Sequence, residues 1–105
     1  MLVVSYRGGE KRVKVKEALP YMQLGCLLCS DYTGVFSDIS AGMTETMPGY
    51  TVLVSRTEQA EDVLRKAREE GYLELSKAPP SVVEEVEMKA RAKIMRATRY
   101  ASELL

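Results

Sequence analysis

The chain has 105 residues, which is the size of one ordinary domain. Its 46% hydrophobic and 29% charged residues are typical of a globular protein and exclude a disordered or fibrous one. The 15 basic and 15 acidic residues balance, so no overall charge favours nucleic acid or an anionic membrane. Histidine is absent, which excludes serine–histidine and cysteine–histidine catalysis and imidazole metal ligands.

The sequence carries no sign of export or of membrane insertion. No apolar run approaches the roughly 18 to 20 residues of a membrane span. The first residues lack the basic, apolar and small segments of a signal peptide. We therefore expect a cytoplasmic protein, in which a disulfide would be unusual.

The first half of the chain predicts a hairpin, a loop and a strand. An apolar run over 2–6 and an alternating run over 12–16 flank two glycines, which is typical of a β-hairpin. A frayed N-terminal arm is the alternative. Residues 18–34 hold a proline and two glycines and are expected to form a loop, with room for one helical turn. Residues 35–40 predict a strand.

The second half begins with the clearest strand, over 50–55, where β-branched residues are frequent. We expect it to pair antiparallel with the 35–41 run. Thr57 is the expected N-cap of a helix over 58–70, which a glycine ends. Residues 72–75 then predict a third core strand, and a strand–helix–strand order suggests a crossover, right-handed if the strands are parallel.

The last segment predicts one long helix over 81–103, about 35 Å in length. Ser81 and Glu84 match a capping box at its start. This helix either packs along the chain's own sheet or meets a partner with an apolar stripe. The stripe has spacings of three and four and consists of Val83, Val86, Ala90, Ile94, Ala97, Ala101 and Leu104.

These elements predict an α+β (α/β-like) fold. It has a small, mostly antiparallel or mixed sheet, one packed helix and a long C-terminal helix. We expect residues 1–78 to form the core domain that contains the cysteine loop. Residues 79–105 form the C-terminal helix, which is a candidate for partner contact.

Cys26 and Cys29 form a C-x-x-C pair, which is the main chemical signal. Two thiols three positions apart can face one centre, so the pair suits a metal, an iron–sulfur cluster or a thiol–disulfide exchange site. The last of these normally follows a strand and opens a helix, a context missing here. Two buried thiols acting as small apolar residues are the structural alternative. With no histidine, two cysteines do not complete a four-ligand zinc or cluster site.

A second signal is the polar-interrupted run from Ser37 to Gly42. Asp38 is either an exposed strand carboxylate or part of a binding site. A glycine at the end of a strand, such as Gly42, lets the backbone approach a ligand closely.

Taken together, these segments resemble the C-terminal domain of the beta subunit of coenzyme F-420 hydrogenases and dehydrogenases. The resemblance covers roughly residues 13–76. The chain departs from the family pattern at Glu45, where a small residue is usual, and at Tyr50 in place of Trp. The matching segments are Cys26-Leu-Leu-Cys29-Ser-Asp31-Tyr32-Thr33, Ser37-Asp38-Ile39-Ser40-Ala41-Gly42, Gly49-Tyr50 and Val52-Leu-Val54-Ser-Arg56-Thr57-Glu58, followed by a helix that ends in Gly71.

The resemblance implies a redox module of methanogen-like archaea that carries electrons between a deazaflavin (coenzyme F-420), FAD and a 4Fe-4S cluster. It implies that Cys26 and Cys29 are cluster ligands and that Asp38, Ser40 and Gly42 lie near the flavin; no residue is assigned a catalytic role. The other cluster ligands would come from the N-terminal part of a beta subunit, another hydrogenase or dehydrogenase subunit, or a second copy in a homodimer. FAD and coenzyme F-420 would bind through a partner.

We therefore expect a non-autonomous part of an F-420-dependent oxidoreductase. The alternative hypothesis is a non-catalytic assembly or regulatory domain of the same family. Such a domain would keep the fold, lose the cofactors and dimerise through the 81–103 helix.

Overall fold

The computed structural model describes residues 1–104 and has an α+β fold, as the sequence predicts. Its strands form two separate two-stranded sheets, and both sheets are antiparallel. The first contains β1 (Leu2–Tyr6) and β2 (Gly9–Val13), and the second contains β3 (Ile39–Met43) and β4 (Thr51–Ser55).

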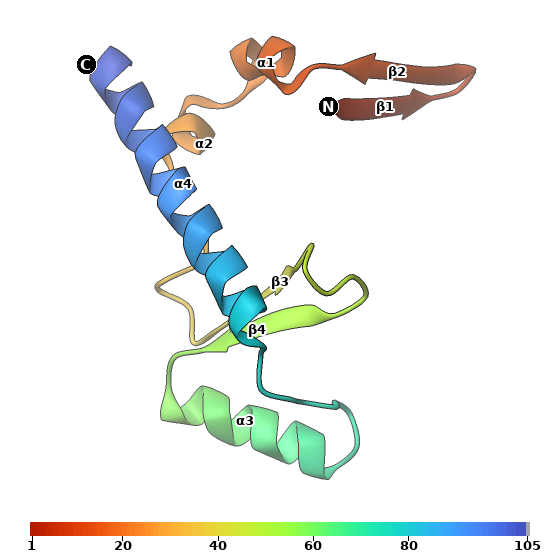
Figure 1. The fold of residues 1–105 in the computed structure, drawn as a ribbon, viewed down its shortest axis with the longest axis vertical. Coiled ribbons are helices and arrows are strands. Elements are labelled where there is room, and N and C mark those ends of the chain that lie inside the picture. Colours follow the sequence, from red (N-terminus) through yellow and green to blue (C-terminus); the bar gives the residue numbers. More distant parts are fainter. Residues whose placement is uncertain (105) are drawn as a thin grey trace.

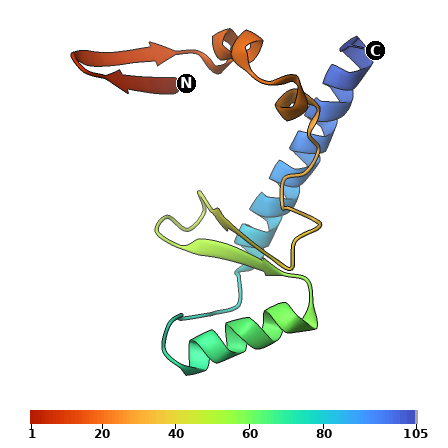
Figure 2. The same cartoon turned by 180° about the vertical axis from the view of Figure 1, so that it is seen from behind.

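Two short helices and a 3-10 turn connect the two sheets: α1 (Val15–Ala18), η1 (Leu19–Tyr21) and α2 (Leu24–Leu28). Two longer helices follow β4, namely α3 (Glu58–Glu69) and α4 (Pro80–Leu104). In both views α4 begins beside the β3–β4 sheet and runs away from it past α2, while the β1–β2 hairpin extends to one side (Figure 1, Figure 2).

The predicted N-terminal hairpin is present, but its second strand lies earlier than the predicted 12–16. Tyr6 pairs with Gly9, so only two residues form the turn. One of them, Gly8, has a φ of 115°, a conformation that suits glycine. The second strand ends at Val13 because α1 begins two residues later.

The strand predicted over 35–40 begins only at Ile39. The backbone N–H of Ser37 donates to the carbonyl of Gly34 at 2.9 Å, and the Ser37 hydroxyl donates to the same oxygen at 2.6 Å. These local bonds hold the preceding residues in a turn rather than in a strand. From Ile39 onward the antiparallel pairing with the 50–55 run is confirmed, with Ile39 opposite Ser55.

The predicted third strand over 72–75 is wrong, and the crossover is wrong with it. The N–H of Tyr72 donates to the carbonyl of Ala67 at 2.9 Å, and Gly71 has a φ of 82°, so this amide belongs to the C-terminal cap of α3. Half-buried Leu75 instead lines a cavity of about 480 Å³ between β4 and the start of α4. The cavity accounts for Leu75, whereas Tyr72 and Leu73 do not line it and are exposed.

The two long helices are confirmed with small shifts at their ends. Thr57 caps α3, because its Oγ1 accepts the N–H of Ala60 at 3.2 Å. Helix α4 starts at Pro80, a residue type that suits the first helical position. Ser81 therefore lies inside the first turn and not at the predicted N-cap.

The face that α4 buries matches the predicted stripe in part. The predicted Ala97 is buried and the predicted Val86, Ala90 and Ala101 are half-buried, but the predicted Val83, Ile94 and Leu104 are exposed. Val82, which is outside the stripe, is buried instead. The half-buried positions on the same side include two charged residues, Glu85 and Lys89, whose polar contacts are described below.

The hydrophobic core is small. Among the residues that the structure describes, the fully buried apolar side chains are those of Ala60, Val82 and Ala97. The radius of gyration is 17.6 Å, well above the roughly 13 Å of a compact chain of this length. Within residues 1–104, no helix is both long and apolar enough to cross a membrane.

Candidate functional site

The two cysteines lie at the end of α2, where this helix packs against α4. Cys26 is inside the helix and Cys29 is the residue that ends it, so the two are about one turn apart and share a side. Both are free thiols; Cys26 is exposed and Cys29 is half-buried. The alternative of two buried thiols in a core is therefore wrong for Cys26.

One backbone oxygen ties the cysteine loop to α4. The carbonyl of Asp31 accepts a bond from Lys93 Nζ at 2.7 Å and a weak one from the thiol of Cys29 at 3.8 Å. The Asp31 carboxylate also accepts the N–H of Val35 at 3.1 Å, which orders the next turn. Lys93 of α4 and the Cys29 thiol thus share one acceptor.

The chemistry of this donor set fits part of an iron–sulfur site. Thiolate sulfur is a soft ligand that suits iron–sulfur clusters, which as a rule take four such ligands. Within residues 1–104, no three histidine, cysteine, aspartate or glutamate side chains gather where they could hold a metal ion. Cys26 and Cys29 therefore fit half a ligand set, and the described residues do not provide the rest.

A cavity of about 330 Å³ lies between the second sheet, the loop after Asp31 and α4. Ser40 and Gly42, two of the residues predicted to bind a cofactor, line this cavity, but Asp38 does not. The side chain of Asp38 is exposed, one position before β3. The lining consists of Tyr32, Thr33, Gly34, Ser40, Ala41, Gly42, Met43, Val52, Val54 and Val86.

Arg56 makes hydrogen bonds to two residues that line this cavity, Thr33 and Ser40. Its Nη2 donates to the carbonyl of Thr33 at 2.8 Å, and its Nη1 donates to the hydroxyls of Ser40 at 3.2 Å and Ser37 at 3.3 Å. The planar guanidinium thereby joins the end of β4 to the loop and to β3. The Ser40 hydroxyl is oriented by this contact.

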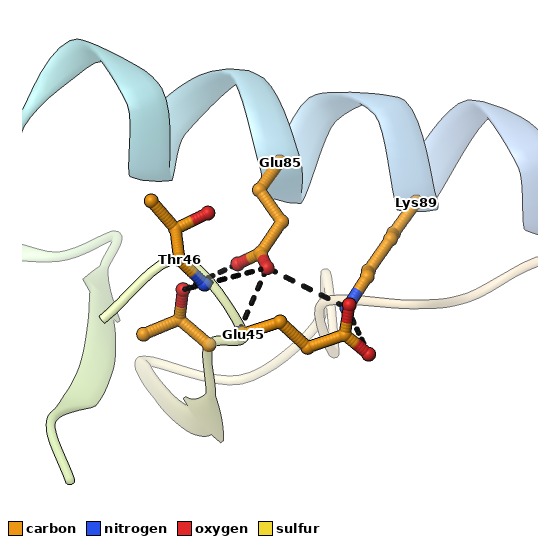
Figure 3. Close-up of polar contacts among 5 residues, drawn as sticks. Glu45, Thr46, Glu85 and Lys89 are labelled. Carbon is orange, nitrogen blue, oxygen red and sulfur yellow. Dashed lines mark hydrogen bonds and ion pairs between the residues drawn. The ribbon is translucent and has the colours of Figure 1, made fainter. Parts of the chain in front are cut away.

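A second polar cluster joins α4 to the turn after β3 (Figure 3). The carboxylate of Glu85 accepts a short bond from the hydroxyl of buried Thr44. The same carboxylate accepts the N–H of Glu45 at 2.8 Å and that of Thr46 at 3.1 Å. Lys89 Nζ lies 3.5 Å from the carboxylate of Glu45 and 3.7 Å from that of Glu85.

These contacts shift the pKa values of Glu85 and Lys89, both on α4. The bond from Thr44 holds the pKa of Glu85 below its usual 4.5; partial burial opposes this shift, and the Glu45 and Thr46 amides and Lys89 support it. For Lys89, burial is the largest single effect and lowers its pKa. The nearby Glu45 and Glu85 carboxylates and Tyr32 together outweigh burial and raise the pKa.

Three residues of this region were not identified from the sequence. Arg56 belongs to the matching Arg-Thr-Glu segment, but the pattern gives it no role. Glu85 and Lys93 look like ordinary charges on a solvated helix face. Each contacts a loop that lies far away in the sequence, 41 residues for Glu85 and Thr44 and 62 for Lys93 and Asp31. Side-chain pattern along a helix gives no signal for such contacts.

Comparison with known proteins gives one family match and several relatives. The family model that matches residues 1–81 describes the C terminus of the beta subunit of coenzyme F420 hydrogenase/dehydrogenase. The matched region includes both cysteines, both sheets and α3, and it stops at the start of α4.

The relatives are longer proteins from methanogens. The chain is 39% identical to coenzyme F420 hydrogenase subunit beta of Methanococcus voltae over 72 residues, which are 69% of this chain and 26% of the relative. It is 33% identical to the subunit of the same name from Methanothermobacter thermautotrophicus over 60 residues, 57% of this chain and 21% of the relative. An uncharacterised protein of Methanocaldococcus jannaschii is 26% identical over 102 residues, 94% of this chain and 36% of the relative. The chain thus spans between 21% and 36% of the length of these relatives.

Proposed function

The chain belongs to the family formed by the C-terminal domains of coenzyme F420 hydrogenase/dehydrogenase beta subunits, and we propose that it is a redox module of an F420-dependent oxidoreductase. In this proposal Cys26 and Cys29 supply two thiolates to a 4Fe-4S cluster that another polypeptide completes. The observation that carries the proposal is the family match over residues 1–81, a region that contains both cysteines as free thiols, with Cys26 exposed.

The surroundings of the cysteines support a shared cluster. Cys26 is exposed and can meet a second chain, while the half-buried Cys29 makes a weak hydrogen bond to the Asp31 carbonyl. Lys93 brings a positive charge to the same oxygen. A cation near the ligands of a cluster offsets part of the cluster's negative charge.

The cavity beside β3 supports a contribution to a flavin site. Gly42 leaves the strand backbone open to close approach, because no atom lies within 4 Å of where its Cβ would be. We propose that Ser40 and Gly42 contact the cofactor inside the cavity and that Asp38 contacts it from the exposed edge. A volume of about 330 Å³ is at the small end for a ligand pocket, which fits a site completed by a partner.

The bound cofactors would supply the electron chemistry, a hydride exchange between deazaflavin and FAD followed by single-electron transfer to the cluster. The chain's own residues would hold the cofactors and orient the groups that contact them. The cysteines bind iron, Arg56 fixes the Ser40 hydroxyl, and Val86 of α4 closes one wall of the cavity. The proposed partners are the N-terminal part of a beta subunit, other hydrogenase or dehydrogenase subunits, or a second copy of the chain, in the cytoplasm.

An iron assay tests the proposal. The full chain, co-expressed with its hydrogenase-type subunits and purified without oxygen, is expected to contain iron and acid-labile sulfide with the electron paramagnetic resonance of a reduced 4Fe-4S cluster. Cys26→Ser and Cys29→Ser should each lose most of the iron. Ser30→Ala, between the cysteine pair and Asp31, is the control and should keep it. A complex that holds no iron, or the same iron in the Cys26→Ser/Cys29→Ser double variant, would overturn the proposal.

The second candidate is a non-catalytic assembly domain that dimerises through α4. It is favoured by the outward side of this helix, where Met88 is 67% and Met95 is 72% exposed. In this case the chain sediments as a dimer, and Met88→Glu with Met95→Glu makes it a monomer. Val63→Glu, at an exposed site on α3, is the control. A chain that sediments as a monomer, or a dimer that the double variant leaves intact, would contradict this candidate.

A further inference from the structure

The strand register gives the β1–β2 hairpin two different faces. Residues directly opposite each other in an antiparallel pair lie on the same face of the sheet. One face, here called the hairpin apolar face, carries Leu2, Val4, Tyr6 and Val13, with Lys11 as its charged member. The other face carries Val3, Ser5, Glu10 and Arg12.

The hairpin apolar face is open. Val4 is 50% and Tyr6 is 59% exposed, and the hairpin extends away from the second sheet and from α4 (Figure 1, Figure 2). A two-stranded hairpin alone is marginally stable in water and normally packs its apolar side on a further strand or helix. This face therefore has the properties of a surface that another element covers.

Charge indicates what kind of element that is. Although the whole chain is neutral, residues 1–16 contain five basic side chains and one acidic side chain, Glu10. Two N-terminal segments of this charge repel each other, which opposes pairing between two copies. An apolar surface bordered by acidic side chains is attracted instead. The five basic residues are Arg7, Lys11, Arg12, Lys14 and Lys16.

The hairpin is part of the region that matches the family model. The family match begins at residue 1 and includes the hairpin, while the relatives are about three to five times as long as the part that this chain matches. The relatives therefore contain polypeptide beyond the part that this chain matches. In this chain, the described residues leave it open.

We propose that the hairpin apolar face is a docking surface for a different protein, one that presents an apolar patch bordered by acidic side chains. This inference rests partly on the proposed function, since a shared cluster also needs a second chain. The surface itself is separate, because none of its residues belongs to the cysteine loop, the cavity or α4.

The register provides a matched test at neighbouring valines. A photo-cross-linking phenylalanine analogue replaces Val4 on the apolar face or Val3, 54% exposed, on the other face, in the full chain in its own cells. Mass spectrometry then identifies the cross-linked peptide. We expect position 4 to give an adduct with an apolar, acid-bordered segment of another protein, and position 3 to give little or none.

Binding measurements with the identified protein complete the test. Val4→Asp should weaken the complex at least about tenfold, since it places a charge in the buried centre of the contact. Val3→Asp should change the affinity by less than about twofold. Added salt should slow association because the hairpin and its partner carry opposite charge. Circular dichroism and thermal unfolding should be unchanged in both variants, since both valines are exposed.

Several outcomes would overturn the docking surface. These are an adduct of position 4 with this same chain, equal adducts from positions 3 and 4, and no adduct from either. An equal loss of affinity in both variants would do the same. The Cys26→Ser/Cys29→Ser double variant should still bind the docking partner. A result that refutes the shared cluster therefore does not by itself refute the docking surface.

Discussion

Glu85 joins two segments that lie far apart in the sequence. Its carboxylate accepts one hydroxyl and two backbone N–H groups of residues 44–46, and the side chain is only 12% exposed. The next residue, Val86, lines the cavity beside β3. The Glu85 contact therefore sets where α4 lies against that cavity.

The lowered pKa of Glu85 gives its contact a defined pH dependence. The folded state holds the carboxylate more strongly than the unfolded chain, so the stabilisation is fully present above the unfolded value near 4.5. It is lost as the pH falls through the lower folded value. Glu85→Gln should therefore lower the urea midpoint at neutral pH, and its deficit should shrink as the pH falls below 4.5.

The matched control for this prediction is Glu84→Gln. Glu84 is the preceding residue on α4 and is exposed. The Glu84 variant should keep the wild-type midpoint at both pH values. A Glu85 variant whose deficit is the same in acid as at neutral pH would show that the carboxylate charge is not what stabilises the contact.

Arg56 provides a second prediction at the residue scale. Its guanidinium donates hydrogen bonds to Thr33, Ser37 and Ser40 at the same time. A lysine ammonium cannot reproduce this planar arrangement of donors. We expect Arg56→Lys to destabilise the chain by about 1–3 kcal/mol in urea unfolding, because charged hydrogen bonds of a half-buried group are lost.

Arg68→Lys, at an exposed position on α3, is the control and should stay within about 0.5 kcal/mol of the wild type. If Arg56→Lys were equally mild, a single positive charge at the end of β4 would be sufficient, and the three-way contact would carry little stability.

At the scale of the element, the N-terminus of α3 depends on one side chain. Thr57 Oγ1 accepts the N–H of Ala60, which is one of the three fully buried apolar residues. Thr57→Ala should cost about 1 kcal/mol, the usual effect of removing a hydroxyl N-cap, in urea unfolding followed by circular dichroism. Thr57→Ser keeps the hydroxyl and should recover most of it. A serine variant as unstable as the alanine variant would contradict the capping argument.

The elements that the sequence predicts well are those set by local chemistry. The glycine-centred hairpin, the 50–55 strand and the Thr57-capped helix all have their determinants within a few residues. The 35–40 strand begins late because Ser37 bonds back to Gly34, a choice that alternation of side chains does not reveal. The 72–75 segment forms no strand because Tyr72 belongs to the C-terminal cap of α3 and Leu75 lines a cavity, and neither role differs from a strand in the pattern of apolar residues.

The candidate site divides in the same way. The spacing and the family resemblance single out Cys26 and Cys29 as a pair. The resemblance also selects Ser40 and Gly42, and the structure places both in the lining of one cavity. The contacts that orient this region come from α4 and from the end of β4. Those contacts depend on how the elements pack in three dimensions, and a single sequence has no signal for them.

At the scale of the whole molecule, stability is distributed unevenly. The buried apolar side chains lie on α3 and α4, while the hairpin has mainly its own cross-strand bonds. Segments with few buried apolar contacts open locally at low free energy. We therefore expect the backbone amides of β1 and β2 to exchange with deuterium well before those of β3, β4 and α3 in the isolated chain.

Hydrogen-exchange mass spectrometry of the full chain, alone and with its docking partner, measures this difference directly. In the isolated chain, peptides covering residues 2–13 should exchange fast and peptides covering residues 51–69 slowly. With the partner, protection should rise at 2–13 because the exposed side of the hairpin becomes covered, and it should rise less at α3. Equal protection of hairpin and α3 in the isolated chain would mean that the hairpin is already covered, by the chain itself or by a second copy. The open apolar face would then not exist in solution.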